Sequence, residues 1–368
     1  MNPLPGSRGV PIGSPRRALW EITWRCDRRC AHCLVRGGAP KNDEMNTREA
    51  LDLADRLADL GVPVVSLTGG EPFLREDWRE IANRVRMRGM RLRFSTNGHL
   101  LDAATVRDLV DLGTESVSVS VDGGKETHDR LRRGPDGAGD SSFDRVLAAL
   151  RRLRPTPINI GVITTVFQQN LDELPRIHAI LKEHGVRRWL VQLAHRTGRL
   201  ADADAAGVCD PLDPVQLPQV AEFIADRAGD PVLAPRAGHS IGYLGRLEPV
   251  LRGSGRAGHP LWRGCPGGAT TIGIEPDGGI KGCANQVGEP FVVGNVREES
   301  LESIWRDRAR WHWLNPPPER MTGACAGCAL AAVCQAGCTA LALRATGGLF
   351  HNPYCLRRME CAGGEAGA

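Results

Sequence analysis

Three cysteines near the amino terminus, Cys26, Cys30 and Cys33, stand at CX3CX2C spacing. Three thiolates in so short a segment suit metal or iron–sulfur ligation, because the thiolate is the ligating form of cysteine. A cubane [4Fe–4S] cluster normally has four cysteine ligands, so three would leave one iron open. A catalytic zinc site also has three protein ligands and an open position, and His32 could be one of them. The spacing alone leaves both cofactors open.

A second set of cysteines lies far along the chain. Four of its members have the spacing CX2CX5CX3C. Two others, Cys265 and Cys283, come earlier in the chain, and the segment EPDGGIKG between them predicts a β-hairpin with Asp-Gly-Gly at its tip. That hairpin would bring Cys283 back toward Cys265. CX2C pairs also build structural zinc ribbons, but seven ligands do not divide into four-ligand sites without a remainder. The set consists of Cys265, Cys283, Cys325, Cys328, Cys334, Cys338 and Cys355.

Composition narrows the chemistry further. The chain has 368 residues, 41% hydrophobic and 24% charged, which is typical of a soluble globular protein. No apolar run is long enough for a membrane span, and the first residues lack the apolar core of a secretory signal. We therefore expect a cytoplasmic protein whose 12 cysteines are reduced, metal-bound or catalytic. The net charge of +4 comes from interleaved acids and arginines, so neither a nucleic acid nor a membrane is expected as partner.

The elements that position these cysteines follow a repeating pattern. Short β-prone segments alternate with amphipathic helical ones, and Asn46 with Glu49 forms a capping box that begins the first helix. The alternation predicts parallel βαβ units, that is, a curved α/β sheet or barrel with helices outside. Ligands of such folds bind at the carboxyl ends of the strands. The six predicted strands are residues 18–24, 62–67, 90–95, 116–121, 158–166 and 187–193.

Residues 1–17, rich in Pro and Gly, predict a disordered tail, and the βα repeat then occupies residues 18–195. Residues 196–264 contain one clear predicted helix, and we expect them to form a bridging region between the βα repeat and the second domain. The cysteine-rich second domain is expected at residues 265–361, followed by a short tail at 362–368.

Polar residues and glycines follow the predicted strands. TGGEP comes after the second strand, STNG after the third, and Asp122 with Gly123-Gly124 after the fourth, SVSVSV. Two glycines would let a ligand approach the backbone, and Glu71 could accept a hydrogen bond from an ammonium group. Each feature alone also fits a turn or a half-exposed strand. Their shared position at strand ends beside the thiols favours a ligand site.

Taken together, CX3CX2C, GGEP, STNG and SVDG resemble the radical S-adenosylmethionine (radical SAM) enzymes over residues 18–195. The resemblance implies a partial (β/α)6 barrel in which the open iron of a [4Fe–4S] cluster binds SAM. One electron from the cluster then cleaves SAM, and a 5′-deoxyadenosyl radical abstracts hydrogen from the substrate. It also implies SAM contacts: Gly69, Gly70 and Glu71 to the amino group, Asn97, Ser120 and Asp122 to the ribose side, Arg133 to the carboxylate, and His32 against the adenine.

The second cysteine set, read as CX12GX4C, CX2CX5CX3C and a final cysteine, resembles the SPASM domain that follows many radical SAM barrels. This resemblance implies two auxiliary [4Fe–4S] clusters: an outer one on Cys325, Cys328, Cys334 and Cys355, and an inner one on Cys265, Cys283 and Cys338. The fourth ligand of the inner cluster would be absent, a non-cysteine group, or Cys209, and we expect an open site. Cys361 lies outside both patterns. Ala284 replaces an aspartate of the sulfatase-maturing relatives, which speaks against formylglycine formation.

The function that the resemblance favours is that of a radical SAM oxidoreductase acting on a ribosomally synthesised peptide, by crosslinking, thioether formation, decarboxylation or epimerisation. Its reductant would be a flavodoxin or ferredoxin. Because residues 1–17 are too few for a leader-binding domain, a separate protein or another surface of this chain would recognise any leader peptide. The alternative is a small-molecule dehydrogenase in natural-product biosynthesis. An electron carrier or zinc-ribbon binding module would leave GGEP and SVDG unexplained.

Overall fold

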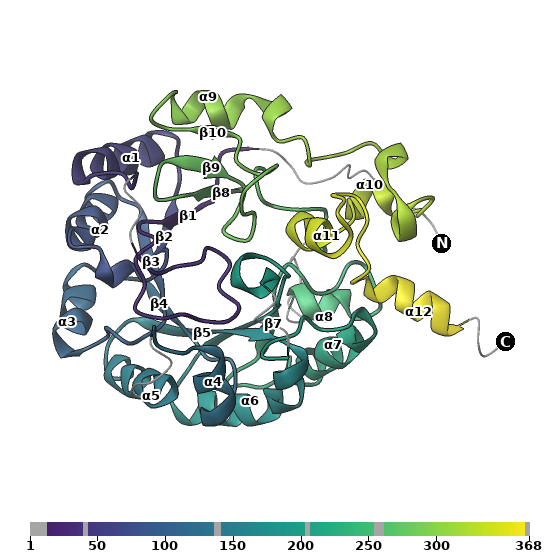
Figure 1. Cartoon of the computed structure of the whole chain (residues 1–368), viewed down its shortest axis with the longest axis horizontal. Coiled ribbons are helices and arrows are strands. Elements are labelled where there is room, and N and C mark those ends of the chain that lie inside the picture. Colours follow the sequence, from purple (N-terminus) through teal and green to yellow (C-terminus); the bar gives the residue numbers. More distant parts are fainter. Residues whose placement is uncertain (1–12, 40–42, 136–140, 203–206, 254–260, 365–368) are drawn as a thin grey trace.

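The computed structural model describes residues 13–39, 43–135, 141–202, 207–253 and 261–364. Ten strands form one curved sheet in the order β10-β9-β8-β1-β2-β3-β4-β5-β6-β7, and helices cover its outer face (Figure 1). The strands are β1 (Arg17–Glu21), β2 (Val64–Thr68), β3 (Arg91–Thr96), β4 (Ser116–Ser120), β5 (Asn159–Val166), β6 (Arg188–Leu193), β7 (Pro235–Ala237), β8 (Thr271–Ile274), β9 (Gly279–Lys281) and β10 (Gly294–Asn295).

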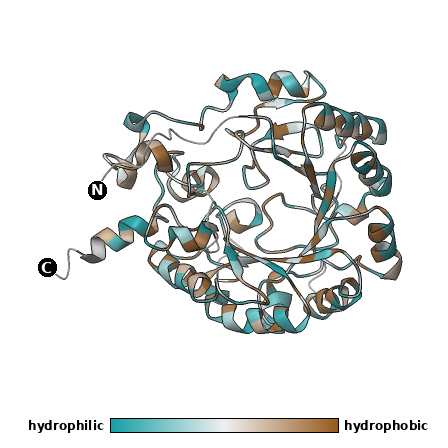
Figure 2. Cartoon of the chain, turned by 180° about the vertical axis from the view of Figure 1, so that it is seen from behind, coloured by the Kyte–Doolittle hydropathy of each residue, from teal (hydrophilic) through white to brown (hydrophobic). Residues whose placement is uncertain are grey.

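The helices that follow these strands have an apolar face against the sheet and a polar face outside. In α1, for example, Leu53 and Leu57 are buried, and Figure 2 shows hydrophilic and hydrophobic residues mixed along the outer helices. In chain order, the α-helices of the described residues are α1 (Thr47–Asp59), α2 (Trp78–Met87), α3 (Ala103–Asp111), α4 (Lys125–Leu131), α5 (Ser142–Leu153), α6 (Leu174–Glu183), α7 (Leu217–Asp226), α8 (Glu248–Gly253), α9 (Leu301–Arg306), α10 (Ala331–Cys334), α11 (Thr339–Thr346) and α12 (Leu356–Gly364).

The α/β architecture with six parallel strands is confirmed. Neighbouring strands from β1 to β6 pair in parallel, and each expected strand is present within a few residues of its predicted ends. The capping box is present as well: the Asn46 side chain accepts a hydrogen bond from the Glu49 N–H, and Glu49 accepts one from the Asn46 N–H. These features depend on local sequence, which explains why local patterns predicted them.

The sheet extends beyond the six predicted strands at both edges. Within the segment expected to be a bridge, β7 pairs in parallel with β6. At the other edge, β8 pairs in parallel with β1, so the cysteine-rich region joins the same sheet. The sequence of β7, PRA, is too short to show a strand period. Of the predicted tails, residues 1–12 and 365–368 lie outside the described residues.

The predicted hairpin between Cys265 and Cys283 is confirmed, because β8 and β9 pair antiparallel around Asp277 and Gly278. A buried charge cluster joins this hairpin to the first strand. The Lys281 ammonium is fully buried and lies 2.9 Å from a carboxylate oxygen of Glu21 in β1 and 2.9 Å from one of Glu275. Although burial acts to lower it, the two carboxylates raise the pKa of Lys281 to about 12. Within the described residues, no helix has the length and apolar character needed to cross a bilayer.

Candidate functional site

The chain that leads from β1 into the first cysteine motif packs directly on the GGE segment after β2. The N–H groups of Gly70 and Glu71 donate to the carbonyls of Thr23 and Arg25, at 2.8 and 2.7 Å. A Cβ atom on Gly69 would collide with the Thr23 carbonyl, and one on Gly70 with the Arg25 carbonyl. The sequence suggested that these glycines admit a ligand. In the structure the approaching backbone is the protein's own, and it sets the start of the cysteine loop.

The three cysteines of the loop lie beyond the carboxyl end of β1, as predicted for a parallel sheet. Cys30 is buried, and Cys26 and Cys33 are half-buried. Backbone N–H groups point at two of the sulfurs, from Arg28 to Cys26 at 3.4 Å and from Gly37 to Cys33 at 3.3 Å. Burial raises the pKa of the Cys30 thiol to about 11, although Arg132 opposes the change. N–H donors and a nearby guanidinium stabilise thiolates, which is what a cluster requires of its ligands.

The donor set of this loop fits an iron–sulfur cluster. It offers soft thiolates, which iron–sulfur clusters take in preference to oxygen ligands. Among the described residues, no three His, Cys, Asp or Glu side chains converge closely enough to hold one metal ion. A cubane does not need such convergence, because its cysteines bind different irons.

Two arginines that the sequence analysis missed stand against the loop. Arg199 donates from its backbone N–H to the Cys33 carbonyl at 3.0 Å and from its guanidinium to the Cys30 carbonyl at 3.3 Å. Gly198, at φ +60°, has no room for a Cβ beside the same carbonyl of Cys33. The sequence did contain a signal for Arg199, because Thr-Gly-Arg follows the sixth predicted strand just as GGEP follows the second. The second arginine, Arg132, has an Nη1 atom 3.9 Å from the Cys30 sulfur.

Asp122, beyond the end of β4, is fully buried and has a charged partner. One of its oxygens lies 2.7 Å from Arg132 Nε and 3.3 Å from His32 Nε2, and the other accepts the Thr165 N–H at 2.8 Å. Although burial acts to raise it, Arg132 and His32 hold the pKa of Asp122 below its usual range. The His32 ring lies 5.0 Å from the Phe167 ring, and its buried Nδ1 has no hydrogen-bond partner in the described structure. That nitrogen is therefore available to a ligand.

Glu71 is fully buried and ties the ends of two strands together. Its carboxylate accepts hydrogen bonds from the Thr96 hydroxyl and the Asn97 N–H, both at 2.8 Å, and burial raises its pKa to about 8. The Asn97 side chain donates to Asp27 in the cysteine loop at 2.7 Å. Both residues thus hold the loop in place, in addition to any contact with SAM.

Two further predicted contact residues differ in their placement. Ser120 is half-buried at the last position of β4. Arg133 is exposed, and its backbone carbonyl accepts the Arg29 N–H at 2.8 Å. The guanidinium inside the site belongs to its neighbour Arg132. A one-residue difference at the end of α4 turns the side chain to a different side, and the sequence pattern does not reveal that turn.

The structure brings together the three cysteines expected to form the inner auxiliary site. Cys265 and Cys338 are buried, and burial raises the pKa of the Cys283 thiol to about 12, with the neighbouring Cys265 adding to the effect. Burial raises the pKa of the Cys338 thiol, and Cys265 and Cys283 both raise it further. The Thr339 hydroxyl donates to the Cys265 sulfur at 3.4 Å. The Cys283 thiolate also acts on the pKa of Arg17, the first residue of β1. The inner group thus lies toward the amino end of the strand whose carboxyl end leads to Cys26.

The four cysteines of the predicted outer site also come together. Burial raises the pKa of the Cys334 thiol, and Cys355, Cys325 and Cys328 raise it further. Burial likewise raises the pKa values of Cys325 and Cys355. The cysteine set of the carboxyl-terminal region therefore divides into three and four by position in space, which is the division that the resemblance to the SPASM domain implies.

Cys209 lies away from the inner group. It is fully buried in a small apolar cluster beside the first cysteine loop, and burial with the adjacent Asp210 raises its pKa to about 11. The other members of this cluster are Ala31, Leu131, Phe167, Ala194 and Leu200. The structure therefore gives no support to Cys209 as a ligand of the inner site. Cys361, in α12, is exposed.

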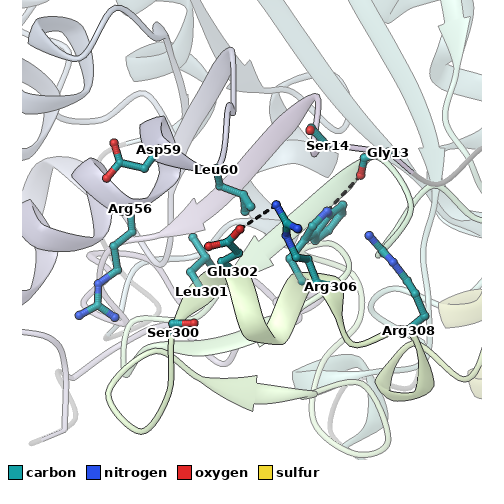
Figure 3. A pocket seen from close by; sticks show the side chains of 11 residues that line it. Gly13, Ser14, Arg56, Asp59, Leu60, Ser300, Leu301, Glu302, Arg306 and Arg308 are labelled. Carbon is teal, nitrogen blue, oxygen red and sulfur yellow. Dashed lines mark hydrogen bonds and ion pairs between the residues drawn. The ribbon is translucent and has the colours of Figure 1, made fainter.

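One large cavity lies elsewhere and does not belong to this site. It measures about 480 Å³ and opens between α1, α9 and the chain that enters β1 (Figure 3). Its charged side chains include the ion pair of Arg306 with Glu302 at 2.7 Å, and the Trp305 indole donates to the Gly13 carbonyl at 3.0 Å. This cavity is on the outside of the sheet, on the amino-terminal side of β1, whereas the first cysteine loop follows the carboxyl end.

Comparison with known proteins agrees with this arrangement. The family model of the radical SAM superfamily matches residues 20–181, and that of the SPASM iron–sulfur cluster-binding domain matches residues 265–329. The chain is 30% identical over 357 residues to an AdoMet-dependent heme synthase of Methanosarcina barkeri, covering 94% of this chain and 97% of that protein. The chain belongs to the radical SAM superfamily and carries a SPASM domain. Its cofactors are accordingly [4Fe–4S] clusters and SAM, and its cysteine groups fit them.

Other relatives and solved structures are similar over most of the chain. The mycofactocin maturase MftC of Mycolicibacterium smegmatis is 29% identical over 336 residues, covering 89% of this chain and 79% of that protein. The structure of anSMEcpe with bound AdoMet and Cp18Cys peptide superposes with a TM-score of 0.71 at 16% identity, covering 92% and 93% of the two chains. Streptococcus suis SuiB bound to S-adenosylmethionine gives a TM-score of 0.69, also at 16% identity, covering 93% of this chain and 76% of that one. At these identities the two structures show the shared fold alone.

Proposed function

We propose that this radical SAM enzyme modifies a ribosomally synthesised peptide by abstracting a hydrogen atom from it. The observation that carries the proposal is the arrangement of thiols in three groups, with the first and the inner group at opposite ends of β1. A second redox centre at the other end of the same strand suits a reaction that must remove an electron from the product. The 29% identity to a mycofactocin maturase over 89% of this chain supports a peptide as substrate.

In this proposal the predicted residues other than Arg133 hold the cofactors. Cys26, Cys30 and Cys33 would hold the cluster, which together with bound SAM would supply the radical chemistry that abstracts hydrogen. The Glu71 carboxylate, together with Gly69 and Gly70, receives the amino group of SAM. The pair of Asp122 with Arg132 orients His32 toward the adenine side. Ser120 and Asn97 contact the ribose side, and Arg132 takes the place that the sequence assigned to Arg133.

The auxiliary thiols are proposed to hold two further clusters. Cys325, Cys328, Cys334 and Cys355 close the outer one, whereas Cys265, Cys283 and Cys338 leave one iron of the inner one open or exchangeable. The Thr339 hydroxyl, which donates to the Cys265 sulfur, is a poor ligand for a soft cluster. A one-electron donor such as a flavodoxin or ferredoxin supplies the reducing electron.

A tetrapyrrole is the second candidate substrate. The heme synthase of Methanosarcina barkeri matches this chain at 30% identity over nearly its whole length. This observation gives the small-molecule alternative a definite chemical class.

Mass spectrometry separates the two substrates. The anaerobically reconstituted enzyme, with SAM and dithionite, is incubated either with any short peptide that is found encoded beside its gene or with iron coproporphyrin III. We expect 5′-deoxyadenosine to accumulate together with a mass change in the peptide, and iron analysis to give about three cubane clusters per chain. A mass change in the porphyrin alone would assign the enzyme to the second class. Zinc in place of iron would contradict both.

A further inference from the structure

A cavity of about 340 Å³ lies at the carboxyl ends of β5 and β6, between the barrel and α11 of the SPASM domain. The barrel side carries Gln168 and His195, and the SPASM side carries Arg344 and Tyr354. Ala194, which also lines the cavity, belongs to the same small apolar cluster as Ala31 of the first cysteine loop. This cluster therefore lies between the cavity wall and the first cysteine loop and contacts both.

His195 is buried in the cavity wall without a partner. His195 is only 4% exposed, and neither of its ring nitrogens has a hydrogen-bond partner in the described structure. Burial, with the positive charge of Arg344 adding to it, lowers the pKa of His195 to about 4, so the ring is neutral at pH 7. A neutral imidazole has one N–H donor and one acceptor nitrogen. Leaving both unpaired is unfavourable unless a ligand satisfies them.

The cavity lining carries two arginines and two aspartates, and its arginines have no carboxylate partner in the part of the chain that the structure describes. Within the described residues, neither Arg196 nor Arg344 forms an ion pair with a carboxylate, and the Arg344 guanidinium donates only to the Val287 carbonyl at 2.7 Å. The acids of the cavity have other partners. Asp210 accepts hydrogen bonds from the Gln169 amide at 2.6 Å and from the Gly207 N–H at 3.3 Å. Asp213 caps the short helix after it by accepting the Val215 N–H at 3.0 Å.

We propose that this cavity binds a carboxylate group of the substrate, held by the His195 N–H and the Arg344 guanidinium. A guanidinium binds a carboxylate through strong charge-assisted hydrogen bonds, and the imidazole N–H adds a directional donor. Because α11 begins directly after Cys338, Arg344 fixes the substrate relative to the inner auxiliary site as well as to the barrel. The inference rests on the proposed function, and names one chemical group that the substrate must carry. That group is a peptide carboxylate or the propionate of a tetrapyrrole.

The test measures how fast phenylglyoxal modifies Arg344 in the reconstituted enzyme with SAM bound, read by peptide mass spectrometry. Arg107, which is exposed in α3, reports the unprotected rate in the same sample. Excess propionate is expected to slow the modification of Arg344 by about fivefold or more, while neutral propionamide and the rate at Arg107 show no effect. In His195→Asn the protection by propionate should weaken, whereas His312→Asn, an exposed histidine, should protect as wild type does.

Two further probes identify the source of the carboxylate. A peptide substrate with a free carboxylate is compared with its amide, and iron coproporphyrin III is tested separately. If Arg344 is protected only by the porphyrin and by propionate, the carboxylate site stands and the proposed peptide function fails. If a peptide is modified by the enzyme but no carboxylate protects Arg344, the site alone is overturned. Equal protection by propionamide and propionate would overturn it too. None of these comparisons depends on the folding of a variant.

Discussion

The buried lysine between the barrel and the SPASM hairpin permits a quantitative test. Lys281→Met keeps a side chain of similar length and removes the charge. Glu21 is 4% exposed, and the substitution leaves its carboxylate with no cationic partner, because the Lys281 ammonium is its counter-ion at 2.9 Å. Removing one partner of a buried ion pair costs about 3–5 kcal/mol. We expect the free energy of unfolding to fall by that amount.

The assay is urea unfolding of the anaerobically reconstituted enzyme. With a slope of about 3 kcal/mol per molar urea, a loss of about 4 kcal/mol lowers the midpoint by about 1.3 M. Lys125→Met is the matched control, because Lys125 pairs with Asp144 and both side chains are more than half exposed. Its midpoint should stay close to that of wild type.

A second substitution tests the cause of the loss. Glu21→Gln added to Lys281→Met removes the uncompensated carboxylate, so part of the lost stability should return. If Lys281→Met lowers the midpoint no more than Lys125→Met does, the charge cluster does not join the hairpin to β1 and the reasoning is wrong.

Three further predictions concern the cofactor site and its surroundings. Replacing Cys26, Cys30 and Cys33 together by Ala should abolish 5′-deoxyadenosine formation while EPR still detects the auxiliary clusters, and continued cleavage of SAM would refute the assignment. Glu71→Gln should weaken SAM binding about ten- to a hundredfold in a calorimetric titration, because a charge-assisted hydrogen bond is worth about 1.5–3 kcal/mol; unchanged affinity would leave Glu71 a structural role only. Burial and the charge of Arg132 lower the pKa of His128 to about 3, and its Nδ1 accepts the Asp122 N–H, so its neutral form stabilises the fold above pH 6.5. That contribution should be lost by about 1.4 kcal/mol per pH unit as the pH falls from 6.5 toward 3, and a slope as steep in His128→Asn would exclude His128 as the cause.

Much of the site was predictable because its signals are local. The spacing of the first three cysteines, the polar residues after the strands and the turn at Asp277 each depend on a few consecutive residues. Parallel strands then bring their carboxyl ends to one edge, so the neighbourhood of Asp122 and the cysteine loop follows from the strand order. The division of the later cysteines into three and four came from the resemblance to the SPASM domain and not from their spacing alone.

What the sequence alone determined about this protein is therefore its class and its cofactors, and it predicted the thiols that would bind them. Only the tertiary structure decided which side chains complete the site. It placed Arg132 rather than Arg133 beside Asp122, brought Arg199 onto the cysteine loop, and left His195 unpaired in a cavity shared with α11. These contacts join residues far apart in the chain, and they depend on helix rotation and on the packing of the SPASM domain against the barrel. Such long-range packing leaves no periodic signal in the sequence, because many sequences with the same local pattern can meet different neighbours.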